Sequence, residues 1–222
     1  LPASEGHHHS YAGGLLDHSL EVMQYAVRAR RGVLYPRGGK EDLISQKSDI
    51  FTYAVASASL LHDVGKVIAD LLVAHTEKKA EQPTIWTPTI GFLPLGESYV
   101  WKANEHKTHK LHEVAGLQVL SLIIPKEGIK WLFSDQELYQ LWLQVIAGQY
   151  GQSGLLGELI QNADHESVQS NIGKIAPISA SLNRFQQTKS NTVSLFTTKM
   201  MQVLKDELQK GELRMNVAGA AG

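Results

Sequence analysis

The sequence predicts a mainly α-helical fold, and two observations support this prediction. Apolar residues recur at intervals of three and four residues through most of the 222-residue chain, which is the period of an amphipathic helix. Helix-breaking residues gather instead near 83–101, where three prolines and two glycines alternate with aromatic and β-branched residues. We therefore expect a helical body that carries one small extended or hairpin insertion near 83–101.

Composition limits the class of protein. A hydrophobic fraction of 43% and a charged fraction of 19% are typical of a chain that buries a core. The formal net charge of −1 gives no global attraction for nucleic acid, so any such binding requires a local basic patch. The absence of cysteine excludes disulfides, thiolate metal ligands and cysteine nucleophiles. No apolar run approaches the roughly 18 residues that span a bilayer, so we expect a cytoplasmic protein without membrane insertion.

Two helices are predicted in the first third of the chain. Apolar residues at helical spacing predict a helix over 14–30, with His18 on the flank of its apolar face. A second helix is expected over 49–63, with Asp49 as its N-cap and His62 at the end of its core-facing stripe. Both histidines are thereby directed toward the protein interior.

The remaining helices follow from the same periodicity. They are expected at 68–72, 111–124, 138–146, 155–172 and 191–210. His112 heads the apolar stripe of the helix expected at 111–124, and Asp164 interrupts the apolar row of the helix expected at 155–172. A carboxylate inside an apolar stripe is costly unless it is paired or binds a metal ion.

The chain is organised around 60–66, where a histidine and an aspartate stand side by side and are followed by Gly65 and Lys66. Imidazole and carboxylate are common ligands of divalent metals. The predicted helices place five such side chains on buried faces: His18, His62, Asp63, His112 and Asp164. Helical bundles build metal sites in this way. We expect one or two divalent ions, with manganese favoured over magnesium, iron, nickel or zinc.

A basic loop follows the first predicted helix. Its candidate contacts to nucleic-acid phosphates are Arg30, Arg31, Arg37 and Lys40. The alternative is an ordinary solvated surface.

The ordered set His18, His62-Asp63 and Asp164, with Gly65-Lys66 after the central pair, resembles the HD superfamily of metal-dependent phosphohydrolases. The resemblance implies an HD-domain helical bundle in which these residues hold one ion and Asp63 bridges to a second. It also implies that His112 is the extra ligand of two-metal members, and that Lys66 contacts the substrate phosphate. Asp63 and Lys66 are thus candidate catalytic residues.

A narrower resemblance is to the HD-type relaxases, the MobH or TraI family of conjugative elements. It is carried by residues 1–5, by the histidines at 7–9, by the stretch 13–22 (Gly-Gly-Leu-Leu-Asp-His-Ser-Leu-Glu-Val) and by Ala163-Asp164 with Ser167-Val168. It implies a bacterial enzyme that nicks DNA at an origin of transfer, with DNA and other relaxosome proteins as partners. The expected division is a catalytic domain at 1–176 and a C-terminal helix and linker at 177–222. We also expect the chain to be an excised part of a longer protein.

Alternatives remain open at the level of the sequence. Bacterial HD-domain 3′–5′ exoribonucleases share the opening over 8–18, but their His-His-Gly motif is replaced here by Gln149-Tyr150-Gly151. The other two alternatives are a nucleotide phosphohydrolase and a catalytically inactive DNA-binding module. His8 and His9 are candidate catalytic residues, each as an outer metal ligand, a proton donor or a phosphate contact. If a covalent DNA adduct forms, Tyr11 and Tyr150 are the candidate nucleophiles.

Overall fold

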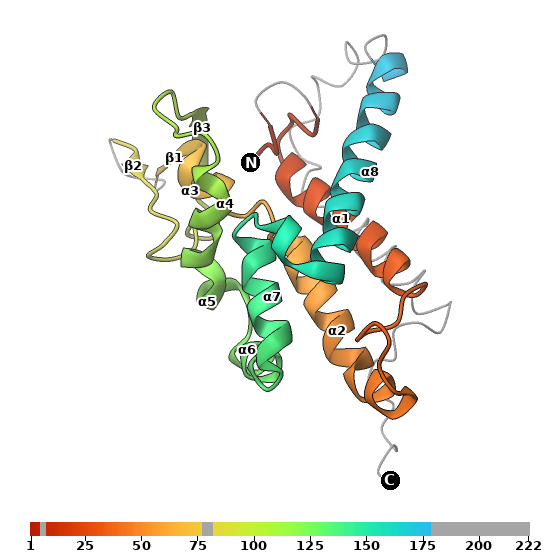
Figure 1. Ribbon diagram of the computed structural model, residues 1–222. Helices are drawn as coiled ribbons and strands as arrows, with labels where there is room; N and C mark the ends of the chain where they lie inside the picture. Colours follow the sequence, from red (N-terminus) through yellow and green to blue (C-terminus); the bar gives the residue numbers. More distant parts are fainter. Residues whose placement is uncertain (5–7, 77–81, 179–222) are drawn as a thin grey trace, which may run out of the picture. The chain divides into compact units, whose positions relative to one another are not determined.

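The computed structural model describes residues 1–4, 8–76 and 82–178, and the side chains of these residues except those of 171–178. Its contacts divide the chain into the units Leu1–Lys174 and Ile175–Gly222. The described part is mainly helical with one small sheet, which confirms the predicted fold class (Figure 1). The helix expected at 191–210 lies outside the described residues.

Helices α1 (Gly14–Arg30) and α2 (Glu41–Leu61) pack side by side and form the centre of the first unit (Figure 1). Helices α6 (Lys126–Phe133) and α7 (Gln136–Ile146) pack against α2, and α8 spans Gly154–Ile178. The largest buried side chains of this core are those of Phe51, Leu61, Leu132, Leu138, Trp142, Ile146, Leu156 and Ile160. The Trp142 indole is fully buried and donates a hydrogen bond to the Ser57 hydroxyl at 2.9 Å, so its polar atom is satisfied inside the core.

The buried face of α1 differs from the predicted one. Its central row is His18, Val22, Ala26 and Arg30, at four-residue spacing, whereas Leu16 is 41% exposed. The prediction that His18 lies on the flank was therefore wrong. Polar contacts hold both ends of this row inside the fold, since His18 meets Asp164 and Arg30 donates to the carbonyl oxygens of Val33 and Ser48.

Helix α2 begins earlier than predicted. It starts at Glu41, with Lys40 in extended backbone before it, so Asp49 lies inside the helix and is not the N-cap. Glu41 and Asp42 occupy the first turn, where negative charge is favourable for the helix dipole. The predicted core stripe is confirmed, since Phe51 and His62, near its two ends, are both buried.

The insertion forms a three-stranded antiparallel sheet of order β2-β1-β3. The strands are β1 (Leu71–Thr76), β2 (Thr84–Ile85) and β3 (Ser98–Ala103), and the short helix α3 (Lys66–Ala69) precedes them. The extended character near 83–101 is thus confirmed, but β2 and β3 each pair with β1 and not with one another. The predicted helix over 68–72 was wrong at its end, because Leu71 and Leu72 already belong to β1.

The segment expected as one helix over 111–124 consists of three short pieces. These are α4 (Leu111–Ala115), the 3-10 turn η1 (Gly116–Val119) and α5 (Leu120–Ile123). A second 3-10 turn, η2 (Tyr150–Gln152), precedes α8. Within the described ranges, none of the helices combines the length and the apolar character needed to cross a bilayer.

Candidate metal centre

The end of α2 presents the His-Asp pair. His62 is the C-cap of this helix and is buried, and Asp63 follows in the turn that leads to α3. Gly65 is required here for steric reasons, since a Cβ at this position would lie 2.0 Å from the His112 carbonyl oxygen and 2.6 Å from the Gly116 nitrogen. The glycine of the motif therefore lets the backbone of α4 pack directly against the turn that carries Asp63.

Four side chains from three parts of the fold converge on one point. The Nε2 atom of His18 lies 3.2 Å from His62 Nε2, 3.4 Å from Asp63 Oδ2 and 3.2 Å from Asp164 Oδ1. His62 Nε2 lies 3.6 Å from Asp63 Oδ2 and 3.8 Å from Asp164 Oδ1. The structure thus brings together the donors of the predicted single-ion site from α1, the end of α2 and α8.

This geometry fits a divalent ion. Bonds of about 2.0–2.2 Å to a tetrahedral ion place its donor atoms roughly 3.3–3.6 Å apart, and the three separations among His18, His62 and Asp63 run from 3.2 to 3.6 Å. These three residues form a group that could hold an ion, and Asp164 Oδ1 lies beside it, 3.2 and 3.8 Å from the two imidazole nitrogens. The Nδ1 atom of His62 lies 2.8 Å from the Ser59 carbonyl oxygen, which can only accept a hydrogen bond. In the neutral His62 ring the proton is therefore on Nδ1, and the lone pair of Nε2 points into the cluster.

The charges of the cluster stabilise one another. Burial disfavours the charged form of His18, but hydrogen bonds to Asp164 and Asp63 outweigh this effect and raise the pKa of His18. Burial likewise opposes ionisation of Asp63, yet His62, His18 and Lys66 hold its pKa well below the ordinary value. The pKa of Asp164 is lowered because His18 and His62 offset burial. Both carboxylates are therefore ionised at neutral pH, as metal ligands must be.

Lys66 lies beside the cluster. Its Nζ atom is 2.5 Å from Asp63 Oδ2 and 3.0 Å from the Ala3 carbonyl oxygen. Together with Ser4, Asp70 and Lys107 it lines a cavity of about 240 Å³. The ammonium group predicted to contact a phosphate thus stands between one donor of the cluster and an accessible cavity.

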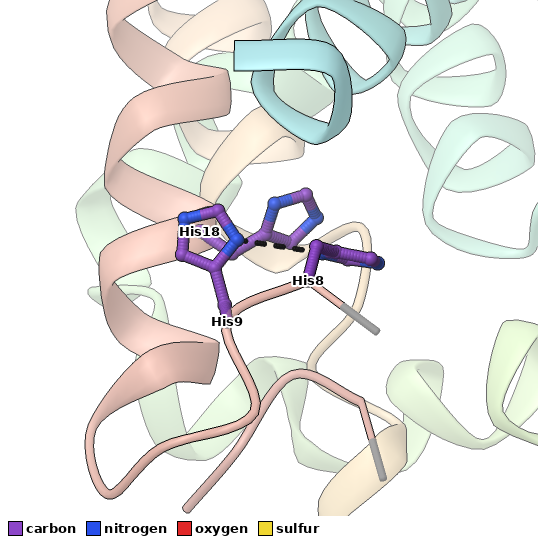
Figure 2. Close-up of side chains that lie close together, drawn as sticks. All are labelled: His8, His9 and His18. Carbon is purple, nitrogen blue, oxygen red and sulfur yellow. Dashed lines mark hydrogen bonds between the residues drawn. The ribbon is translucent and has the colours of Figure 1, made fainter. Parts of the chain in front are cut away.

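The N-terminal histidines reach the same region (Figure 2). His8 and His9 form, with His18, a second group whose ring nitrogens lie within 4.8 Å of one another. The rings of His8 and His18 have their centroids 4.9 Å apart. Burial, together with the nearby charges of His18 and Lys66, lowers the pKa of His8 to about 4, so this ring is neutral at physiological pH.

Three other predicted site residues are not among the four converging side chains. His112 is half-buried and its Nδ1 atom is 3.1 Å from Asp70 Oδ2, and it belongs to neither of the two groups that could hold an ion among the described residues. The Tyr11 hydroxyl donates to Asp17 at 2.9 Å, and burial together with Asp17 raises the pKa of Tyr11. Burial, followed by Asp63 and Asp164, raises the pKa of Tyr150.

The four predicted basic residues do not share one environment. Arg30 is buried, and its guanidinium donates to the carbonyl oxygens of Val33 at 2.9 Å and Ser48 at 3.1 Å. This is the geometry of a structural residue, which corrects its assignment as a phosphate contact. Arg31, Arg37 and Lys40 are exposed, and Arg37 forms an ion pair with Glu158 at 2.6 Å.

Two polar residues beside the cluster, Glu21 and Ser167, were not predicted as site residues from the sequence. Ser167 is fully buried and meets His18 Nδ1 at 3.1 Å, and its hydroxyl donates to Glu21 at 3.2 Å. Neither residue type marks a metal site by itself. The pattern that could have found them is the repeated i, i+3 spacing, since Glu21 follows His18 by three residues and Ser167 follows Asp164 by three.

Comparison with known proteins assigns the chain to a family. Residues 1–222 match the TraI_2 family, which is described as "Putative helicase". No curated protein and no solved structure matches the chain. Because the family match covers the whole chain, this protein belongs to the conjugation-related TraI_2 family.

Proposed function

We propose that the unit 1–174 is a metal-dependent phosphodiesterase that nicks one DNA strand at an origin of transfer. The observation that carries the proposal is the convergence of two imidazole nitrogens and two carboxylate oxygens from His18, His62, Asp63 and Asp164. The 222 residues contain no Gly-x-x-x-x-Gly-Lys-Ser/Thr phosphate loop, so the chemistry proposed for them is built on this cluster.

A divalent ion bound by these four residues would polarise a phosphoryl oxygen and favour attack on phosphorus. The chain supplies the remaining functions. Lys66, beside the cavity of about 240 Å³, would stabilise the negative charge that builds on the non-bridging oxygens. His8 is neutral and packs against His18, so it can exchange a proton with the attacking or the leaving oxygen. These roles agree with the phosphodiester chemistry inferred from the sequence resemblance.

The DNA partner is supported by the conjugation-related family and by the exposed cations after α1. We expect the double variant Arg31→Ala/Lys40→Ala to weaken binding to DNA of any sequence. Each phosphate contact that is lost should reduce the slope of log K against log salt by about one. A fluorescence-anisotropy titration at several salt concentrations measures this. The exposed pair Lys126 and Lys130 on α6, changed to alanine, is the control, and equal slopes for both double variants would contradict the assignment.

The direct test combines metal analysis with cleavage. The purified 222-residue chain should retain close to one equivalent of a divalent metal by mass spectrometry, with manganese favoured. In the presence of Mn²⁺ it should convert a supercoiled plasmid carrying the element's origin of transfer to the open circular form. A plasmid that lacks this origin is the control.

The same experiment separates the alternative functions. Shortening of single-stranded RNA from its 3′ end, without nicking of the plasmid, would instead identify a 3′–5′ exoribonuclease. Release of phosphate from free nucleotides would identify a nucleotide phosphohydrolase. Absence of both bound metal and cleavage would leave a binding module and overturn the proposal.

A further inference from the structure

A chain of polar contacts runs behind the metal centre. Ser167 Oγ stands 3.1 Å from His18 Nδ1 and 3.2 Å from Glu21 Oε2. A hydroxyl has one proton, and a carboxylate oxygen can only accept, so Ser167 donates to Glu21 and accepts from His18. His18 therefore holds a proton on Nδ1. Its other nitrogen, Nε2, faces Asp63 and Asp164 and donates to them in the metal-free protein, so Nε2 is the atom at which an ion would replace a proton.

The N-terminal histidines extend this network, and Figure 2 shows the contact between His8 and His9 next to His18. His9 Nε2 lies 3.2 Å from the same oxygen of Glu21, so the His9 proton is on Nε2. In the neutral His9 ring, Nδ1 is then the acceptor, and it faces Nδ1 of His8 at 3.4 Å, so His8 donates. Every donor in the network thus points, directly or through a neighbour, toward one carboxylate oxygen of Glu21.

Burial fixes this arrangement of hydrogen bonds. His9 is 1% exposed, and His18 and Ser167 are fully buried, so water cannot readily replace a lost partner. Helices α1 and α8 each contribute a pair of residues that lie one turn apart. On α1, Glu21 lies one turn after His18, and on α8, Ser167 lies one turn after Asp164. Each helix therefore supplies one candidate metal ligand to the cluster and one residue of the network that orients a histidine.

We propose that Glu21 is the positioning residue of the metal centre. Through Ser167 it fixes the tautomer of His18 that offers Nε2 to an ion, and through His9 it fixes the tautomer of His8. This inference rests on the proposed metal site. An ion displaces the Nε2 proton, and the neutral ring that remains keeps its proton on Nδ1, where Ser167 accepts it. Without Ser167 the Nδ1 proton has no acceptor, so the neutral ring prefers the tautomer whose Nε2 proton bonds to Asp164, and an ion displaces that proton at a greater cost.

The test uses Ser167→Ala and Glu21→Gln in the full 222-residue chain, with two readouts. Calorimetric titration with Mn²⁺ should show affinity lowered roughly 10- to 100-fold, the usual effect of removing a residue that orients a ligand. Because both residues act through His18, the double variant should bind about as weakly as the weaker single variant. In the metal-free protein at alkaline pH, ¹⁵N NMR of the histidine rings should show His18 protonated on Nδ1 in the wild type and on Nε2 in Ser167→Ala.

Two matched variants control for burial and for charge. Ser153→Ala removes a buried hydroxyl that donates to the Gln149 carbonyl oxygen, and Glu166→Gln removes an exposed charge next to Ser167. Both should keep wild-type affinity and the wild-type His18 tautomer. Unchanged Mn²⁺ affinity and an unchanged tautomer in Ser167→Ala would overturn the role of the network. A wild-type chain that binds no Mn²⁺ would overturn the metal centre, whereas the NMR readout tests the network independently.

Discussion

Replacing Asp63 with asparagine should remove both bound metal and DNA nicking. The amide keeps the shape of the side chain but lacks the negative charge, and Asp63 Oδ2 is one of the four converging donors. We expect Mn²⁺ affinity to fall more than 100-fold, beyond the range for an orienting residue. The nicking rate should fall about 1,000-fold or more, because a metal ion contributes several kcal/mol to stabilising the transition state. Plasmid relaxation under single-turnover conditions measures the rate.

Thermal unfolding distinguishes a lost ligand from a lost fold. Mn²⁺ at 100 times its dissociation constant should stabilise the wild type by about 2.7 kcal/mol and Asp63→Asn by almost nothing. The metal-free Asp63→Asn protein should melt below the metal-free wild type, because the amide loses the ion pairs with His62, His18 and Lys66 that lower the pKa of Asp63; the shift that Mn²⁺ adds to each protein reports the lost ligand. Asp42→Asn, which removes an exposed charge in the first turn of α2, should behave as the wild type. Nicking by Asp63→Asn at the wild-type rate would rule out a catalytic ion at this site.

Substituting Gly65 with alanine should cause the largest loss of stability at the motif. The backbone of Gly65 has φ −64° and ψ −14°, an ordinary right-handed conformation that alanine adopts readily. Helix propensity alone would favour alanine by up to about 1 kcal/mol. The new Cβ, however, would lie 2.0 Å from a backbone oxygen of α4, which cannot move as a flexible side chain can. We expect the clash to prevail and to destabilise the fold by about 3 kcal/mol.

In a domain of this size that loss lowers Tm by roughly 6–12 °C, measurable by circular dichroism. Gly91→Ala provides the matched control, because a Cβ there has no heavy atom within 4 Å. A Gly65→Ala protein that melts within about 2 °C of the wild type would show that α4 does not press against the turn as described. Loss of metal affinity in the folded variant would further link this contact to Asp63.

The helices that sequence analysis located well are those with a strong apolar period. The predicted 14–30 helix agrees with α1 in both bounds. The start of α2 could not be found in this way, because its first turns are polar and exposed, and Asp49 is a favoured N-cap type that lies inside the helix. Helix α6 was not predicted because a proline at 125 is typical of a helix end, although Pro125 is the N-cap of α6. The sheet order was missed because β1 has the composition of a helix end.

The candidate site, too, could be predicted from the sequence only in part. Residue types and their order predicted the four candidate ligands that the structure brings together, but no spacing along the chain indicates that His18 and Asp164 meet. That contact depends on how α1 and α8 pack. Arg30 shows the converse limit, since its position in a basic run predicted a surface residue and helix packing buried it. Glu21 and Ser167 were missed because their role depends on which proton each atom carries, which only the three-dimensional contacts define.

The contact between His18 and Ser167 joins residues 149 positions apart. During synthesis, the first of these helices must therefore wait for nearly the whole unit to be translated before its partner exists. Closing so long a loop is slow compared with local helix formation. If the four donors bind an ion, its capture marks the completion of the domain, and a chain truncated before Asp164 would retain α1 and α2 without the nuclease chemistry. The proposed activity would then be withheld from unfinished polypeptides.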